Sequence, residues 1–364
     1  MIITEYDVVL LDMSNIFYRS YCAINYENDN GVDVSGIFGT LQTIQSLLRQ
    51  LNPKCVVAVF DGKGGSKKKK KIYDKYKEGR SIPIKVSEFI RPEDFQKERE
   101  KSRENFLSQM RKLNEFLSYL PIYRVAIEGY EADELIAYIA QNFLKNNSIA
   151  IVSGDKDFQQ LHTDTHHCYY LHTKTIVSEY ELEQKWGSSY GKMITIARCF
   201  FGDASDNING IYGFKLKTLQ NYFPYLFDKA FRPETIEDVF KRMEEEYSVI
   251  QEKGKEYATN FKTLLAKHKY ILEDDDKDSC IKCRDILKRN YTLMQLFEPD
   301  INMEARMRLN NVFTQGVEFK PIDYKQSIIR EGIQIIDKTM LAWELSYKDL
   351  DIYQKKFKEK FLLT

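Results

Sequence analysis

Three short apolar runs in this chain each lead into an aspartate. The runs at 8–11, 56–60 and 149–152 are followed by Asp12, Asp61 and, after Ser153 and Gly154, Asp155. Short β-branched runs of this kind are typical of strands that are buried on both faces of a parallel sheet. Because such sheets place their functional groups just beyond the carboxyl ends of the strands, we expect the three carboxylates to meet at one edge.

Further acidic residues follow these strands and are candidates for the same edge. Two carboxylates about 4 Å apart repel each other by roughly 4 kcal/mol at an effective dielectric constant of 20. A cluster of this kind is therefore tolerable only together with bound cations. The additional acids are Glu131, Asp133, Glu134, Asp157, Asp203 and Asp206.

Length and composition are those of a globular, enzyme-sized protein. With 364 residues the chain can form one large domain or two ordinary ones. The first residues lack a basic segment, and the first apolar run is short and leads into Asp12, so we expect neither a signal peptide nor a membrane span and predict a cytoplasmic protein. The six cysteines are scattered and are expected to be reduced. Cys280 and Cys283 form a single CxxC, which leaves both a zinc site and two incidental thiols open.

Positive charge is concentrated in one segment, although the net charge of the chain is zero. Residues 63–112 contain seventeen Lys and Arg against eight Asp and Glu, a surplus of nine positive charges. This basic segment also carries Tyr73, Tyr76, Lys77 and Arg80, side chains that can stack on bases or hold phosphates. The pattern favours nucleic-acid binding beside the acidic edge, and a solvated loop is the alternative.

Strands that alternate with amphipathic helices predict an α/β domain over residues 1–202. Helical spacing of apolar residues separates the first strand from the second at 38–48, and the second from a further strand at 106–120. Beyond residue 202 the pattern becomes mostly helical. We therefore predict a second, mainly helical region with a C-terminal extension over residues 203–364.

Six motifs follow one another in order along the chain. They are Asp12-Met13-Ser14-Asn15 with Tyr18-Arg19, Phe60-Asp61-Gly62, Tyr76-Lys77-Glu78-Gly79-Arg80, Gly129-Tyr130-Glu131-Ala132-Asp133-Glu134, Ser153-Gly154-Asp155-Lys156-Asp157 and Gly202-Asp203-Ala204-Ser205-Asp206-Asn207. Together they resemble the motifs of the 5′ nuclease superfamily, whose members are flap endonucleases, polymerase-associated 5′ to 3′ exonucleases and phage ribonuclease H enzymes. The resemblance covers roughly residues 5–223.

The resemblance implies a PIN-like α/β fold, with a mostly parallel central sheet flanked by helices, and a two-metal nuclease site. In the family two divalent ions, usually Mg²⁺ with Mn²⁺ as a substitute, act on the scissile phosphate. Carboxylate oxygens suit these hard cations. Glu134 stands where the family usually has aspartate, so whether its side chain reaches the metal ions is an open question. By matched position the metal ligands are Asp12, Asp61, Glu131, Asp133, Glu134, Asp155, Asp157, Asp203 and Asp206.

The basic segment is similar to the helical arch that covers the active site in the family. The resemblance makes Lys77 and Arg80 catalytic cations that neutralise charge on the reacting phosphate. Two surface cations on a loop are the alternative. Tyr76 is expected to stack on a base. The lysines of the segment that would contact nucleic acid are Lys67, Lys68 and Lys69.

Residues 210–218 resemble the helix-turn-helix with which the family holds duplex DNA through its backbone. The family pattern is G-V-x-G-I-G-x-K-T, and this chain keeps Gly210 and Gly213 but has Lys215 in place of the third glycine. A glycine lets the main chain approach a phosphate or a potassium ion closely, whereas lysine brings a charge. We expect Lys215 and Lys217 to contact the duplex, and the substitution puts a potassium site in doubt.

The pattern as a whole predicts a monomeric, metal-dependent 5′ to 3′ exonuclease or flap endonuclease. The expected substrates are DNA or RNA–DNA duplexes with a 5′ end or flap. The expected role is removal of primers or flaps in replication and repair, and replication proteins are candidate partners. The alternatives are a PIN-like ribonuclease and a catalytically inactive nucleic-acid-binding relative. An aspartyl phosphotransferase is disfavoured because Ser14 stands where it would need a second acid. The cleavage mode and the preference for RNA or DNA stay open.

Overall fold

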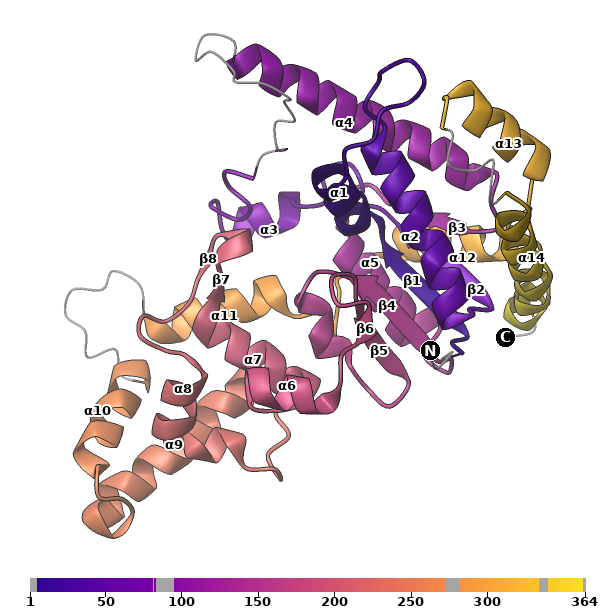
Figure 1. Ribbon diagram of the computed structural model, residues 1–364. Helices are drawn as coiled ribbons and strands as arrows, with labels where there is room; N and C mark the ends of the chain where they lie inside the picture. The colour runs from indigo at the N-terminus through magenta and orange to yellow at the C-terminus, as the bar shows by residue number, and fades with distance from the viewer. Residues whose placement is uncertain (1–4, 81, 83–94, 273–281, 334–339, 363–364) are drawn as a thin grey trace.

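A computed structural model describes residues 5–80, 82, 95–272, 282–333 and 340–362, and its core is a six-stranded sheet (Figure 1). The three aspartate-ending runs form β1 (Val8–Asp12), β2 (Cys55–Val59) and β4 (Ile149–Ser153). Their residues are all buried, as the apolar runs predict. The strand order β3-β2-β1-β4-β5-β6 places the three strands side by side.

All strands of the sheet except the last are parallel. β3 (Tyr123–Val125) pairs with β2, and β5 (His166–Tyr170) pairs with β4, whereas the short β6 (Thr175–Ile176) is antiparallel to β5. The register aligns Val8 of β1 with the first residues of both β2 and β4. The carboxyl ends of the three central strands therefore lie level at one edge of the sheet.

One face of the sheet packs on the first helices of the chain and, unexpectedly, on the last. Val9 and Leu11 of β1 belong to this core. The two C-terminal helices return to the sheet here and lie beside each other near the C-terminus (Figure 1). The helices of this face are α1 (Met13–Ala23), α2 (Ser35–Leu51), α4 (Phe95–Ser118), α13 (Pro321–Arg330) and α14 (Met340–Leu362).

The opposite face carries Val8 and Leu10 of β1 and a second set of helices. The first of these helices is α5 (Ala132–Tyr138), and a five-residue π-helix, η1 (Ile139–Phe143), follows it directly. Helix α12 (Met303–Gln315) reaches this face from the C-terminal part of the chain through Leu309 and Phe313. The other elements on it are the 3₁₀ turn η2 (Asp157–Leu161), α6 (Glu179–Trp186) and α7 (Gly191–Phe201).

A third core joins the other side of α7 to a helical body. Figure 1 shows α8, α9 and α10 grouped on the side of α7 that faces away from the sheet. A small antiparallel pair, β7 (Gly202–Asp203) with β8 (Ile208–Asn209), leads into it and contains the turn η3 (Ala204–Asp206). The elements of the body are α8 (Leu216–Tyr222), η4 (Pro224–Phe227), α9 (Ile236–Lys253), η5 (Gly254–Glu256), α10 (Phe261–Leu272) and α11 (Cys283–Met294).

The predicted fold class is confirmed by this sheet and its helical layers. The division into residues 1–202 and 203–364 stays a prediction, and α12, α13 and α14 pack against the sheet rather than on the helical body. Of the expected arch at 63–112, the structure describes the short helix α3 (Lys67–Ile72), the residues up to 80 and the part of α4 from residue 95. Cys280 of the CxxC lies outside the described residues. No described helix is both long and apolar enough to span a membrane.

Candidate active site

The ends of β1 and β4 are tied together at the acidic edge of the sheet. Asp12 ends β1 and caps α1, because its carboxylate accepts the Asn15 backbone N–H at 3.2 Å. The Ser153 hydroxyl donates to the same carboxylate at 2.7 Å and accepts the N–H of Asp155 at 3.0 Å. The Asn15 side chain in turn accepts the N–H of Gly154 at 2.8 Å. Hydrogen bonds to the Ser153 hydroxyl therefore connect Asp12 and Asp155, two of the three predicted strand-end aspartates.

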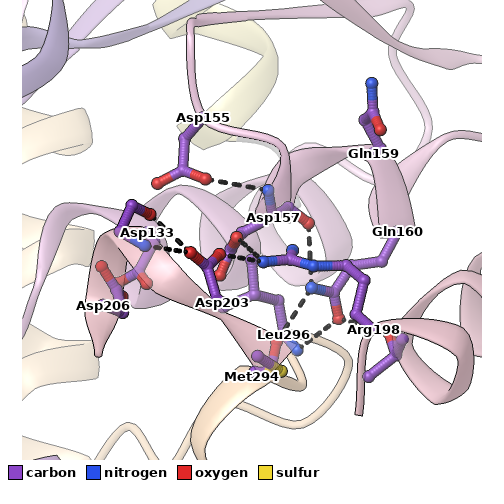
Figure 2. Close-up of polar contacts among 12 residues, drawn as sticks. Asp133, Asp155, Asp157, Gln159, Gln160, Arg198, Asp203, Asp206, Met294 and Leu296 are labelled. Atoms are coloured by element: carbon purple, nitrogen blue, oxygen red, sulfur yellow. Dashed lines mark hydrogen bonds and ion pairs between the residues drawn. The ribbon is translucent and has the colours of Figure 1, made fainter. Parts of the chain in front are cut away.

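A buried arginine joins the next two acids (Figure 2). The N–H of Asp157 donates to Asp155 at 2.9 Å, which orients these two carboxylates in one loop. The Nη2 atom of Arg198 contacts Asp157 and also Asp203, the latter at 2.7 Å. Asp203 further accepts the backbone N–H and the hydroxyl of Ser205. Residues from the loop after β4, from η2, from α7 and from β7 are thus linked into one acidic group.

Asp61 and the start of α5 supply further carboxylates. Asp61, at the end of β2, accepts the N–H of Ala132 at 2.8 Å and so connects the second strand to this helix. Glu134 folds back to accept the N–H of Glu131 at 2.9 Å. Acids at a helix N-terminus are favoured by the helix dipole. Glu134, which replaces the family's aspartate, therefore spends at least one carboxylate oxygen on capping its own helix.

Glu131 is the contact point of the basic segment. Its buried carboxylate receives the Tyr76 hydroxyl at 2.9 Å, Lys77 Nζ at 2.6 Å and Lys69 Nζ at 2.8 Å. Lys69 also lies 3.0 Å from Asp133. Charge-assisted bonds of this kind are the strongest class of hydrogen bond in proteins. Two lysines and one tyrosine of the predicted arch therefore already lie in the acidic group.

Arg80 reaches the last of the predicted acids. Its guanidinium pairs with Asp206 and donates from Nε to the carbonyl of Ser205 at 3.0 Å. Hydrogen bonds also hold the backbone before Arg80 in place. The N–H of Lys77 donates to the Asp206 carbonyl at 2.9 Å, and the Asn207 amide donates to the carbonyl of residue 75. Lys77 adopts a left-handed conformation with φ of 53° in this contact. Residues 75–80 are thus fastened to the loop that carries Asp203 and Asp206.

Two nucleic-acid contacts expected from the sequence do not fit this arrangement. Tyr76 is only 1% exposed and belongs to the same buried core as Met193, Ile196 and Phe200, so its ring is enclosed and is not available to stack on a base. Lys69 is 8% exposed and is held between carboxylates instead of facing solvent. Burial of the tyrosine ring in an apolar core and pairing of the ammonium group with two acids explain both corrections.

The other predicted contacts lie at the surface. Lys67 and Lys68 are exposed, and Lys68 pairs with Asp300. In the predicted duplex-binding segment Gly210 is partly buried, Gly213 is exposed with φ of 77°, and Lys215 and Lys217 are exposed at the start of α8. Lys215 has φ of −129°, an extended conformation that any residue adopts. The lysine therefore replaces the family's third glycine without backbone strain.

Burial raises the pKa of several carboxyls in the acidic group. It raises the pKa of Asp12 to about 7, that of Glu134 to about 7 and that of Asp157 to about 8. Burial is also the main cause of the raised pKa of Asp155 and of Asp206. A raised pKa means that the charged form lacks full compensation in its surroundings. The acidic group as a whole is therefore short of positive charge.

Two carboxyls show the opposite shift because cations and donors touch them. Burial alone would raise the pKa of Asp133, but the charges of Lys69 and Lys77 and the hydrogen bonds to the carboxylate together outweigh it, and the pKa is lowered. The pKa of Asp203 is also lowered against the effect of burial, by the Ser205 hydroxyl and by the charge of Arg198. These side-chain cations hold their partners in the ionised form.

The donor set fits divalent cations. Nine predicted acids face four side-chain cations, Lys69, Lys77, Arg80 and Arg198, so negative charge remains in excess. All the donors are carboxylate oxygens, the ligands that Mg²⁺ prefers. Within the described ranges no three acidic, imidazole or thiolate groups already enclose a metal position. Instead, Lys69 lies between Glu131 and Asp133, and Arg198 lies between Asp157 and Asp203.

Sequence reasoning missed Arg198 and the role of Ser153. Ser153 belongs to a motif, but its bond to Asp12 depends on the pairing of β1 with β4. Arg198 carried a weak signal, since it interrupts an apolar helix pattern at Met193, Ile196, Ala197 and Phe200 only five residues before Asp203. A charged residue at such a position needs a buried partner.

Comparison with known proteins gives related sequences for the α/β part of the chain. Residues 7–187 match the family model described as 5′-3′ exonuclease, N-terminal resolvase-like domain. A 5′-3′ exonuclease of Buchnera aphidicola subsp. Schizaphis graminum is 31% identical over 217 residues, which cover 58% of this chain and 67% of the relative. The 5′-3′ exonuclease of Aquifex aeolicus is 27% identical over 289 residues, 79% of this chain and 91% of the relative.

A solved structure is similar over a longer part of the chain. The flap endonuclease of bacteriophage T5, determined as a complex with DNA and metal ions, has a TM-score of 0.53 and 16% identity. The match covers 90% of this chain and 99% of the phage protein. At this identity the likeness establishes the shared fold, which includes the helical body and not the sheet alone.

Proposed function

This chain belongs to the 5′-3′ exonuclease family, and from that membership we propose that it is a divalent-metal-dependent nuclease that hydrolyses phosphodiester bonds near the 5′ ends of DNA. We propose Mg²⁺ as the working ion, with Mn²⁺ as a substitute. Duplexes with a 5′ end or flap, RNA–DNA hybrids included, are the proposed substrates, and primer or flap removal in replication and repair is the proposed role.

One observation carries the proposal: carboxylates from three strand ends, α5 and the β7 loop meet the cations of the basic segment at one edge of the sheet. Lys77 and Arg80 contact Glu131 and Asp206 directly. An acidic group beside cations on long side chains suits a reaction in which metal ions and a phosphate must be held together. The ligands proposed for the two ions are Asp12, Asp61, Glu131, Asp133, Glu134, Asp155, Asp157, Asp203 and Asp206.

When bound, the two ions supply the activation of water and the neutralisation of charge on the scissile phosphate. The chain's own residues do the rest. Lys77 and Arg80 bring positive charge to the acidic edge, where they can exchange their carboxylate partners for phosphate oxygens, which carry the same charge. Asp155 and Asp157 are fixed by backbone bonds, so they need little reordering to bind cations.

Duplex contact is proposed for the start of α8. Lys215 and Lys217 are exposed there beside Gly213, and Tyr212 is 95% exposed. Cations and backbone N–H groups at a helix start suit phosphate oxygens without reading the sequence of the bases. The protein would thus recognise the shape and the end of its substrate.

The direct test is cleavage of labelled 5′-flap, nicked and RNA-primed duplexes with Mg²⁺, with Mn²⁺ or with a chelator. We expect cleavage only with a divalent ion, and its loss in Asp155→Asn. Asparagine keeps an oxygen that can accept the N–H of Asp157, so the loop is retained while a charge is removed. The lengths of the products separate cleavage at the junction from cleavage at the end.

A matched control is Asp349→Asn, at an exposed position of α14. It removes the same charge far from the acidic edge and should cleave like the wild-type protein. Products formed in the presence of chelator, or equal cleavage by Asp155→Asn and the wild type, would contradict the proposed function.

A further inference from the structure

Arg198 is a buried arginine to which the family resemblance gave no role. It lies on α7, five residues before Asp203, and its side chain is 2% exposed. Arginine is almost never fully buried unless its charge is paired. Its position therefore depends on the acids around it.

The guanidinium connects two acids that come from different elements. Its Nη2 atom contacts Asp157, at the start of η2, and Asp203, in β7 (Figure 2). Burial alone would lower the pKa of Arg198, but the charges of the two acids raise it above its usual range. The arginine is thus held in its charged form as a fixed cation between them.

The backbone of Asp157 is held from the same helix. The buried Gln160 side chain donates to the Asp157 carbonyl at 2.8 Å and accepts the hydroxyl of Thr195, on α7, at 2.9 Å. Its amide also donates to the Met294 carbonyl at 2.9 Å and accepts the N–H of Leu296 at 2.8 Å (Figure 2). Helix α7 therefore fixes Asp157 at its carbonyl through Gln160 and at its carboxylate through Arg198.

Arg198 differs from the other cations of the acidic group in where it is anchored. Lys69, Lys77 and Arg80 belong to the basic segment, residues 63–112. Arg198 instead lies on a helix that packs against the sheet through Ile194 and Ala197 and against the helical body through its other face. It is therefore anchored by a helix that two cores hold, whereas the other three cations lie on the basic segment.

We propose that Arg198 is a positioning residue of the metal site, the resident counter-ion that holds Asp157 and Asp203 together until divalent ions neutralise them. The inference rests on the proposed function, because it assigns the same two acids to metal binding. Arg198 and the metal ions then stabilise the same carboxylates. Removing both must cost more than the sum of removing each, since either cation alone limits the repulsion between the acids.

The test compares thermal unfolding in chelator and in saturating magnesium chloride for the wild type, Arg198→Met and Arg198→Lys. We expect Arg198→Met to lower Tm by roughly 5 °C in chelator and by clearly less in magnesium. The magnesium-dependent gain in Tm is then larger in this variant than in the wild type. Arg198→Lys keeps the charge and should recover most of the loss in chelator.

Arg242 provides a matched control. Its guanidinium also bridges two carboxylates, those of Asp228 and Glu245, but it lies on α9 in the helical body. Arg242→Met should change Tm equally with and without magnesium. Arg198→Met placed in an Asp157→Asn background should cost less than in the wild type, and this comparison needs no metal. It also applies if the single variant does not fold in chelator.

The outcomes separate the inference from the function on which it rests. Binding of Mn²⁺ to each protein, followed by electron paramagnetic resonance without DNA, shows whether the wild type holds metal at all. Wild-type protein that binds no Mn²⁺ and gains no Tm from magnesium would overturn the metal site and the inference with it. Wild-type protein that binds metal, with Arg198→Met losing the same Tm in both buffers, would overturn the inference alone.

Discussion

At the scale of single residues, Glu131 shows how the acidic edge is kept stable. Three donors from residues 69–77 surround one buried carboxylate. The sequence marked Glu131 and its donors as parts of two separate motifs. It did not show that they meet, because the contact depends on how residues 63–80 pack across the start of α5.

Tyr76→Phe tests the hydrogen bond that ties this buried ring to Glu131. The variant keeps the ring but loses the hydroxyl that donates to Glu131, so we expect unfolding to require about 1.5–3 kcal/mol less free energy. Denaturant titration measures the change. Tyr180→Phe, at a 70% exposed position, is the control and should be neutral. Wild-type stability of Tyr76→Phe would mean that the hydroxyl bond to Glu131 adds nothing to the stability of the fold.

Lys77→Ala tests the catalytic role of the cation closest to Glu131. The variant removes a charge that is placed to hold the phosphate, so single-turnover cleavage should slow by roughly 10²-fold or more. Lys75→Ala removes an exposed lysine two residues away and should cleave normally. Equal rates for the two variants would leave Lys77 as a structural partner of Glu131 only.

At the scale of elements, prediction succeeded where a local pattern determines the result. The apolar runs became adjacent parallel strands, and the acids after them lie at one edge, because buried β-branched residues admit few other arrangements. Prediction failed where the position of a side chain depends on elements that are distant in sequence. Tyr76 has the local character of an exposed arch residue, yet it lies in the buried core that joins α7 to the helical body. The same helix supplies Arg198.

The start of α8 carries a prediction about duplex binding. Lys215→Ala should weaken binding to duplex DNA of any sequence and make its dependence on salt shallower, by about 0.9 in the log–log slope for one lost phosphate contact. Fluorescence anisotropy over a series of salt concentrations gives this slope. Lys241→Ala, an exposed lysine of α9, should leave it unchanged. An unchanged slope in Lys215→Ala would exclude this lysine from the phosphate contacts.

At the scale of the whole molecule, the C-terminal helices close the α/β core. The mostly helical pattern after residue 202 predicted helices, but it carried no sign that α12 and α14 would pack on opposite faces of the sheet. Such packing depends on which apolar surfaces of the sheet the first 200 residues leave uncovered. Amphipathic helices can cover any of them, so their own sequence does not identify the partner.

Phe313→Ala measures how firmly α12 belongs to the core. The ring is 1% exposed and lies 5.2 Å, between centroids, from Tyr123 of the edge strand β3 and 5.6 Å from Phe143. Truncation leaves a cavity at the sheet, so we expect a loss of about 3–5 kcal/mol in the free energy of unfolding. Met307→Ala, on the same helix but 61% exposed, should change it by less than about 0.5 kcal/mol. If both variants unfold like the wild type, α12 is a loosely attached segment; if only Phe313→Ala is destabilised, in one cooperative transition, the C-terminal helices and the nuclease sheet fold as one unit.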